Sequence, residues 1–264
     1  MAHTYTLVNQ KGGVGKTTTA INLAASLGQL GQRVLIVDID PQANATSSLG
    51  IDKHTVGNGV YDTLIGAATA AALILHSPRF KISILPASPA LAGAEVELVD
   101  APERESRLRN ALEPLQGRYD YILIDCPPSL NLLTINGLLA AADGLIIPVQ
   151  CEYLALEGLG QLTQTVNRVR SSLFPGLSIR GVVLTMYDSR TRLATDVVGE
   201  VRRVFPDKVF NSVIPRSIRL AEAPSYGQPI TAYDPASHGA KAYASLASEL
   251  LEGDGVPIKP PQEG

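Results

Sequence analysis

The sequence Gln10-Lys11-Gly12-Gly13-Val14-Gly15-Lys16-Thr17-Thr18 stands between two segments of different character. Residues 5–8 have the apolar pattern of a short strand, and residues 19–27 have that of a helix. A glycine-rich loop between a strand and a helix is the arrangement that a phosphate-binding loop needs. The stretch therefore predicts a polyphosphate site near the start of the chain.

The residue types in this loop suit a nucleotide and its metal ion. Lys16 has the reach and charge to meet β- and γ-phosphate oxygens. The Thr17 hydroxyl can bind the accompanying Mg²⁺, and Thr18 can contact the α-phosphate. Glycines let successive backbone N–H groups turn toward one concavity, where the start of the helix adds the positive end of its dipole. The glycines of the loop are Gly12, Gly13 and Gly15.

The loop departs from the usual P-loop pattern, because Gln10 stands where the first glycine is expected and Lys11 follows it. We expect Lys11 to point away from the cradle that Lys16 fills, toward a nucleotide held by another subunit. Residues 11–18 resemble the deviant Walker A box of the ParA/MinD class of P-loop ATPases. In that class the first lysine crosses to the partner's nucleotide, so the resemblance implies ATP, Mg²⁺ and an ATP-dependent homodimer.

Two carboxylates follow the second predicted strand, residues 33–38. Asp38 and Asp40 lie at the carboxyl end of this apolar run, where parallel sheets place their ligands. Acids with the same side-chain direction beside a P-loop suit a Mg²⁺ shell and an attacking water. Residues 38–42 also resemble switch I of the class, which implies that Asp40 orients the water and Asp38 belongs to the Mg²⁺ shell.

A third acid, Asp125, ends the apolar run of residues 119–124 and precedes Pro127 and Pro128. This is the form of a Walker B strand, whose acid holds Mg²⁺ through water. Strands and helices alternate along the chain. The alanine-rich residues 67–75 are expected to be helical. The alternation predicts an α/β fold: a twisted, mostly parallel sheet with helices on both faces, in a P-loop NTPase architecture.

A basic segment lies between Arg180 and Arg219. Residues 180–219 contain eight basic and four acidic side chains, whereas the whole chain has a formal net charge of −3. The resemblance implies that the turn at Pro215 and Ser217 holds the adenine, with the contact at Ser217 open because the class has Asn there. It also implies that Arg190 and Arg219 contact the DNA backbone, although solvated surface arginines remain an alternative.

Composition and length bound the remaining questions. With 264 residues, 45% of them hydrophobic, we expect one domain over residues 1–252 and a disordered tail over residues 253–264. No apolar run approaches the roughly 20 residues of a membrane span, and the start of the chain lacks a signal-like segment, so we expect a cytoplasmic protein. The proline-rich residues 256–261 cannot form the basic amphipathic anchor of the MinD branch.

The sequence thus predicts a ParA/Soj-type partitioning ATPase that binds non-specific DNA as an ATP-dependent dimer and associates with the nucleoid. The resemblance alone implies a ParB-like centromere-binding partner that accelerates hydrolysis. Three alternatives stay open: a membrane-positioning ATPase of the MinD kind, an iron–sulfur ATPase in which Cys126 and Cys151 of two subunits hold a cluster, and a non-catalytic nucleotide-gated scaffold.

Overall fold

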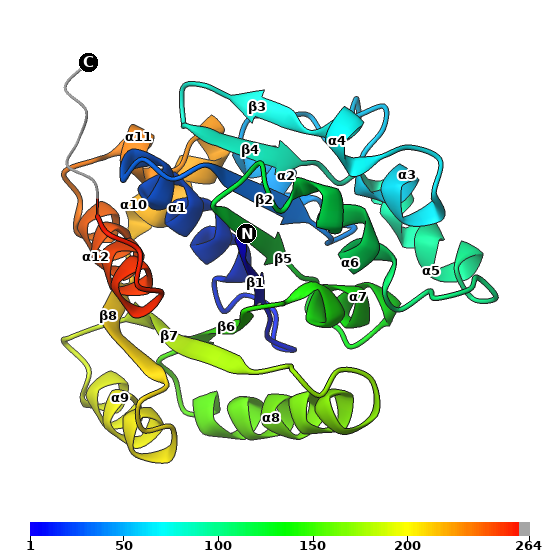
Figure 1. The fold of residues 1–264 in the computed structure, drawn as a ribbon. Coiled ribbons are helices and arrows are strands. Elements are labelled where there is room, and N and C mark those ends of the chain that lie inside the picture. Colours follow the sequence, from blue (N-terminus) through cyan, green and yellow to red (C-terminus); the bar gives the residue numbers. More distant parts are fainter. Residues whose placement is uncertain (259–264) are drawn as a thin grey trace.

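The computed structural model describes residues 1–258, which form one eight-stranded sheet covered by helices (Figure 1). The strands are β1 (His3–Leu7), β2 (Val34–Asp38), β3 (Leu75–Ser77), β4 (Ile82–Leu85), β5 (Tyr121–Asp125), β6 (Gly144–Gln150), β7 (Ile179–Tyr187) and β8 (Val209–Pro215). They are arranged in the order β3-β4-β2-β5-β1-β6-β7-β8. Every neighbouring pair is parallel except β3 and β4, which confirms the predicted mostly parallel sheet.

Helices cover both faces because the strands are apolar on both. The α-helices are α1 (Lys16–Gln29), α2 (Asn44–Ser48), α3 (Val60–Ile65), α4 (Ala70–Leu73), α5 (Ala94–Glu97), α6 (Arg107–Leu112), α7 (Leu132–Ala140), α8 (Ala155–Ser172), α9 (Arg192–Val204), α10 (Ile218–Glu222), α11 (Ile230–Tyr233) and α12 (His238–Gly253). In β2, Val34 and Ile36 pack in the core under α1 and α12, whereas Leu35 and Val37 pack on the opposite face under α3 and α6. The helices α8 and α9 cover the same opposite face beyond β6.

Strand β1 lies inside the sheet between β5 and β6, and the strand order reverses there. Such a reversal opens a crevice at the carboxyl ends of the strands, and ligands of parallel sheets bind in it. Three of these strand ends lie at one level, because Leu7 of β1 and Asp38 of β2 are both register partners of Asp125 of β5. The glycine loop that follows β1 therefore opens beside both acids.

One part of the residue 67–75 prediction is wrong. Only Ala70–Leu73 is helical, and Leu75–Ser77 forms β3, which pairs antiparallel with β4 at the edge of the sheet. Alanine favours a helix locally, but the unpaired edge of β4 offers backbone hydrogen bonds that a longer helix would leave unmade. Among the described residues, no helix is long and apolar enough to cross a membrane.

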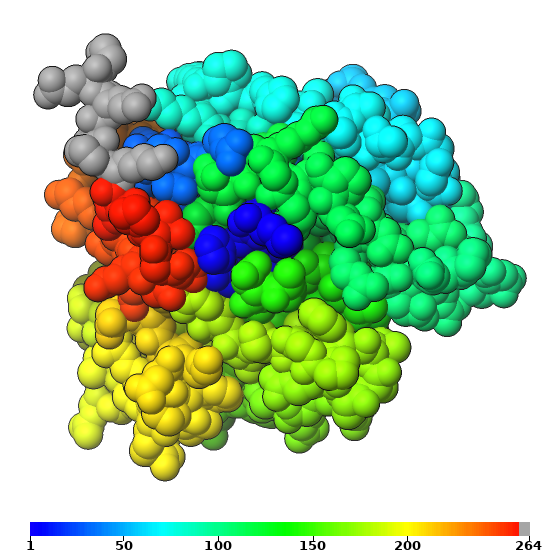
Figure 2. All heavy atoms as spheres, in the orientation of Figure 1, coloured from blue at the N-terminus to red at the C-terminus, as the bar shows by residue number. Residues whose placement is uncertain are grey.

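The predicted disordered tail begins too early at Gly253. Helix α12 extends through Gly253, and the side chain of Asp254 is only 3% exposed. It accepts hydrogen bonds from the hydroxyls of Tyr5 (2.7 Å) and Tyr121 (3.0 Å) and pairs with Arg180 (3.0 Å). These partners lie near the amino ends of β1, β5 and β7, and both figures show α12 beside the start of the chain (Figures 1 and 2).

Composition could not reveal this anchor, because its partners lie far from Asp254 in the sequence. Burial and the nearby Asp254 carboxylate raise the pKa of both tyrosines, so Tyr5 and Tyr121 remain hydrogen-bond donors. The rest of the predicted tail, residues 259–264, lies outside the described residues.

We predict that Asp254→Ala lowers the free energy of unfolding by about 2–4 kcal/mol, because it leaves Arg180 and two tyrosine hydroxyls without their buried acceptor. Glu252→Ala, two residues before the anchor and exposed, should change it by about 0.5 kcal/mol or less. Urea denaturation of both variants measures the difference. Equal losses in the two variants would show that Asp254 does not anchor the chain.

Candidate nucleotide and magnesium site

The loop after β1 has the backbone that a phosphate cradle needs. Gly13 and Gly15 adopt left-handed conformations, with φ of 75° and 89°, which residues with a side chain rarely do. Gly15 caps the start of α1, and its carbonyl accepts the first helical hydrogen bond, from the amide of Thr19. Thr185 of β7 holds the loop from outside, because its hydroxyl donates to the carbonyl of Val14 at 2.8 Å.

Lys16 lies within this loop and is only 7% exposed. Its Nζ donates to the carbonyl of Lys11 at 3.0 Å, across the opening of the loop. Burial lowers the pKa of the Lys16 ammonium, and the nearby carboxylates of Asp125 and Asp40 oppose that shift. A phosphate in the loop would offer Lys16 a charged acceptor in place of a backbone carbonyl.

Thr17 and Asp125 form the part of the site that fits a magnesium ion. The Thr17 hydroxyl donates to Oδ2 of Asp125 at 2.7 Å, while Oδ1 is buried without a hydrogen-bond partner among the described residues. Burial, with a contribution from the Asp38 carboxylate, raises the pKa of Asp125 well above its usual range. A divalent cation would satisfy this oxygen and compensate the buried charge, so the donor set fits Mg²⁺.

No group of three or more His, Cys, Asp or Glu side chains within residues 1–258 could hold a metal ion by itself. A Mg²⁺ ion beside a nucleotide needs no such group, because phosphates and waters complete one or two protein ligands.

Asp38 and Asp40 differ from the prediction that they face the site in the same way. Asp38 is fully buried, and its oxygens accept hydrogen bonds from the Thr46 amide (2.9 Å), the Thr46 hydroxyl (2.8 Å) and the Asp40 amide (3.2 Å). Burial raises its pKa to about 6. Asp40 uses Oδ1 to accept from the Gln42 amide at 2.9 Å. Asp38 therefore holds the backbone around Asp40. Of these two acids, Asp40 is the one whose charge acts on the pKa of Lys16, which it raises.

Lys11 lies at the entrance of the loop and does not turn into it. Its ammonium pairs with Glu152, which follows β6, and both side chains are partly exposed. Asn9 fixes the backbone here, since its Oδ1 accepts from the Lys11 amide (3.0 Å) and its Nδ2 donates to the Pro148 carbonyl (2.8 Å). Sequence reasoning missed both Asn9 and Glu152. Their places directly after β1 and β6 were the available signal, because ligands gather at such strand ends.

A cavity of about 250 Å³ lies next to the glycine loop. It brings the predicted Pro215 and Ser217 together with Gly15 and Thr18, and apolar side chains of Ile214, Leu220 and Tyr243 line it as well. Met186, whose φ of 53° is unusual for a residue with a side chain, also lies in its wall. An apolar cavity that continues from the phosphate loop suits a nucleotide base.

The two arginines predicted to meet DNA follow neighbouring strands. Arg190 lies in the loop after β7, and Arg219 lies on α10 after β8, so both are at the carboxyl edge of the sheet. Both are exposed, but neither charge is free. Arg190 forms two hydrogen bonds to Asp188, at 2.7 and 2.9 Å, and holds the pKa of that carboxyl at about 2. Arg219 pairs with Glu222 at 3.1 Å.

The two cysteines do not resemble cluster ligands. Cys126 and Cys151 are both buried, and burial raises the pKa of Cys126 well above its usual range and that of Cys151 to about 11. A cluster shared by two subunits needs sulfur atoms at the subunit surface, whereas Cys126 is packed in the core with 1% exposure. The geometry therefore disfavours the iron–sulfur alternative.

We predict that Asp125→Asn stabilises the nucleotide-free protein while it impairs Mg²⁺ binding. Burial raises the pKa of the Asp125 carboxyl, so the folded state holds a proton that the unfolded state has released, and stability falls as the pH rises above the usual range of an aspartate. Because the variant removes one buried charge, it should be more stable than the wild type at pH 7.5, and the gain should be smaller at pH 4.5. Urea denaturation without nucleotide measures both values, and equal gains at the two pH values would contradict the prediction.

Known proteins are similar to this chain along nearly its whole length. A family model described as an AAA domain matches residues 2–179. The sporulation initiation inhibitor protein Soj of Bacillus subtilis is 55% identical over 244 residues, which are 92% of this chain and 96% of that protein. The chromosome-partitioning ATPase Soj of Treponema pallidum is 52% identical over 97% of this chain and 99% of its own.

Solved structures of other proteins also resemble this chain along nearly its whole length. Cobyrinic acid a,c-diamide synthase from Mycobacterium smegmatis, solved with ADP and magnesium, has a TM-score of 0.85 and 38% identity, over 99% of this chain and 100% of its own. The septum site-determining protein MinD from Pyrococcus horikoshii, complexed with Mg-ADP, has a TM-score of 0.78 and 30% identity, over 97% and 98%. With its P-loop after β1 and relatives that match it over nearly their whole length, this chain belongs to the Soj and ParA family of chromosome-partitioning ATPases.

Proposed function

We propose that Mg-ATP closes two copies of this chain into a dimer that holds DNA without sequence preference, and that ATP hydrolysis releases the DNA. The observation that carries the proposal is the division of the two loop lysines. Lys16 lies inside the loop, whereas Lys11 lies at its entrance on a partly exposed pair with Glu152. A lysine so placed can leave Glu152 for a nucleotide held by a second subunit.

In this proposal each predicted residue of the nucleotide site has a role. The amides of Gly12, Gly13 and Gly15 and the start of α1 would hold the phosphates, with Lys16 on the β- and γ-phosphate oxygens and Thr18 near the α-phosphate. Pro215 and Ser217 would line the base. Thr17 and Asp125 would bind Mg²⁺, which neutralises phosphate charge when bound. Asp38 would act through the backbone around Asp40, because both its oxygens are already engaged.

Hydrolysis would depend on Asp40 and Lys11. Asp40 has one oxygen on the Gln42 amide, so its other oxygen can accept a hydrogen bond from the attacking water and orient it. Lys11 of one subunit would compensate the negative charge that develops on the phosphate bound to the other subunit. Because that contact exists only in the dimer, dimerisation and turnover become linked.

DNA binding would use Arg190 and Arg219, which lie at the same edge of the sheet as the nucleotide. Arginines on loops and short helices suit phosphates and read no sequence. Association with the nucleoid follows from this role. A ParB-like centromere-binding protein would be the partner that accelerates hydrolysis, as membership of the Soj and ParA family suggests.

We predict that Asp40→Ala lowers ATP hydrolysis about 100-fold or more, because the water loses its orienting carboxylate, while the ATP-bound dimer persists. Lys11→Ala is the matched control: it should bind ATP with unchanged affinity but remain monomeric. Steady-state hydrolysis and size-exclusion chromatography with light scattering distinguish the two variants. Dimers of Lys11→Ala as stable as those of the wild type would disprove the assigned role of Lys11.

We also predict that Arg219→Glu weakens ATP-dependent DNA binding and reduces the slope of log affinity against log salt by about 1 for each DNA phosphate that the protein no longer neutralises. Glu222→Gln should do the opposite, because it removes the nearer of the two acidic partners of Arg219, Glu222 at 3.1 Å and Asp234 at 3.6 Å. Arg168→Glu, an exposed charge change on α8, is the control. Fluorescence polarisation with a DNA duplex across a salt series gives the slopes. If Arg219→Glu and Arg168→Glu behave alike, DNA lies elsewhere on the molecule.

A further inference from the structure

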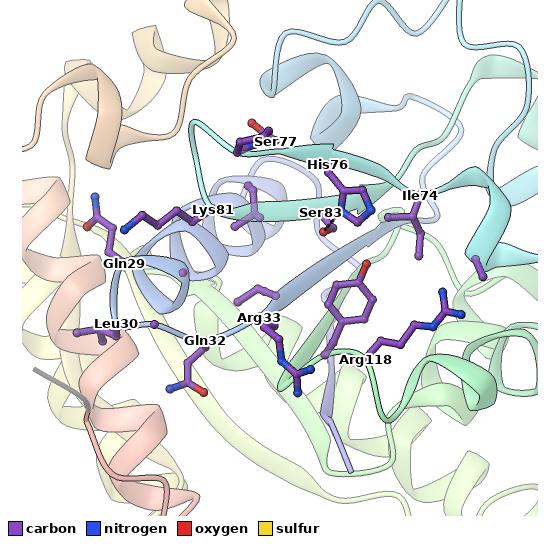
Figure 3. A pocket seen from close by; sticks show the side chains of 17 residues that line it. Gln29, Leu30, Gln32, Arg33, Ile74, His76, Ser77, Lys81, Ser83 and Arg118 are labelled. Carbon is purple, nitrogen blue, oxygen red and sulfur yellow. Dashed lines mark hydrogen bonds between the residues drawn. The ribbon is translucent and has the colours of Figure 1, made fainter. Parts of the chain in front are cut away.

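A cavity of about 670 Å³ lies at the amino ends of β2 and β4, whereas the nucleotide site lies at the carboxyl ends of the strands (Figure 3). The end of α1, the starts of β2 and β4, and residues of β3 line it. The nucleotide loop is at the other end of α1, a helix of 14 residues, which places about 20 Å between the two sites. The cavity is therefore no extension of the nucleotide pocket.

The cavity is basic. Its lining includes Arg33, Lys81 and Arg118 and contains no Asp or Glu. Arg33 pairs with Asp120, at 2.8 and 3.1 Å. Lys81 and Arg118 are exposed, and within residues 1–258 neither side chain forms a hydrogen bond or ion pair. Figure 3 shows Lys81 at one end of the view and Arg118 at the other, with Arg33 between them. Two cationic groups thus remain uncompensated around one hollow.

The backbone that carries Lys81 is held in place. Lys81 has a φ of 56°, a conformation that costs a residue with a side chain about 1 kcal/mol or more. Its carbonyl rests against Gly28 of α1, where an added Cβ would lie only 2.7 Å from the oxygen. Contact with α1 therefore fixes the turn before β4 and keeps Lys81 beside the cavity.

The rest of the lining suits an organic molecule rather than a bare ion. Ile74 and Ile82 provide apolar surface. His76 and Ser83 form a polar pair, with Nδ1 and Oγ 2.8 Å apart, so polar groups are present on the same wall. The volume falls within the roughly 300–1,000 Å³ of small-molecule sites.

We infer that this cavity is a second binding site, which takes a small organic anion. A phosphate or carboxylate group of the ligand meets Lys81 or Arg118, and its apolar part packs against Ile74 and Ile82. The site is independent of the nucleotide chemistry, because Lys81, Ile82 and Arg118 lie at the amino ends of β4 and β5, whereas the glycine loop follows the carboxyl end of β1.

Isothermal titration calorimetry on the full chain, saturated with Mg-ADP so that the nucleotide loop is filled, tests this site. Phenyl phosphate, benzoate and inorganic phosphate are the probes. We expect phenyl phosphate to bind saturably and more tightly than inorganic phosphate, because only the former has an apolar part. Tighter binding of phenyl phosphate than of benzoate assigns a phosphate head group, and the reverse order assigns a carboxylate.

Three variants locate the binding. Lys81→Glu combined with Arg118→Glu should weaken phenyl phosphate binding at least tenfold by reversing the charge. Ala71→Trp should do so by filling the cavity, since Ala71 lies in its wall. Arg168→Glu on α8, outside the cavity, should leave binding unchanged. Unchanged ATP hydrolysis in all three variants shows that they are folded.

Three results would overturn the inference. One is the lack of saturable phenyl phosphate binding up to about 10 mM, a concentration that already corresponds to an affinity too weak for a built site. Another is binding that the double variant and Ala71→Trp leave intact. The third is binding of a hexaglutamate peptide without any binding of phenyl phosphate, which would make the cavity a groove for an acidic peptide instead.

Discussion

The hydrogen bond from Thr17 to Asp125 is the contact on which the nucleotide site depends. It joins the first turn of α1 to the end of β5, so the phosphate loop and the predicted metal-binding acid hold one geometry. The other oxygen of Asp125 is buried without a partner among the described residues, beside a second buried acid, Asp38. Such an arrangement costs stability in the nucleotide-free protein, and a cation removes that cost. The site is thus built to favour its occupied state.

Near the amino ends of the strands, another buried carboxylate has the partners that Asp125 lacks. There the carboxylate of Asp254 is also buried, but Arg180, Tyr5 and Tyr121 satisfy it completely. A satisfied buried carboxylate holds elements together, whereas an unsatisfied one favours the binding of a ligand. The two ends of the strands therefore differ. Near the amino ends the buried carboxylate of Asp254 has all its partners, whereas at the carboxyl ends Asp125 has an oxygen without a partner among the described residues. The basic cavity at the end of α1 lies at the amino ends of β2 and β4.

Much of the fold and of the site could be predicted because the signals are local. Continuous apolar runs such as residues 34–37 and 121–124 indicate strands buried on both faces, and residues that follow such strands meet at one edge. That reasoning predicted a shared site for Lys16, Thr17, Asp40 and Asp125, and the fold places these four residues near one another. It failed where a distant contact decides the outcome. The edge of β4 recruits Leu75–Ser77 as a strand, and Asp254 is fixed by residues more than 70 positions away.

The sequence by itself determined the phosphate loop, the alternation of strands and helices outside residues 67–77, and the family, since each rests on neighbouring residues whose conformations and spacing are local properties. Only the tertiary structure decided how each charged group is compensated. Asp38 was predicted to face magnesium but holds Thr46, Lys11 pairs with Glu152, and Arg190 and Arg219 have acidic partners. The partner of a charge depends on which strand ends and loops the fold brings together, and local sequence carries no record of those distances.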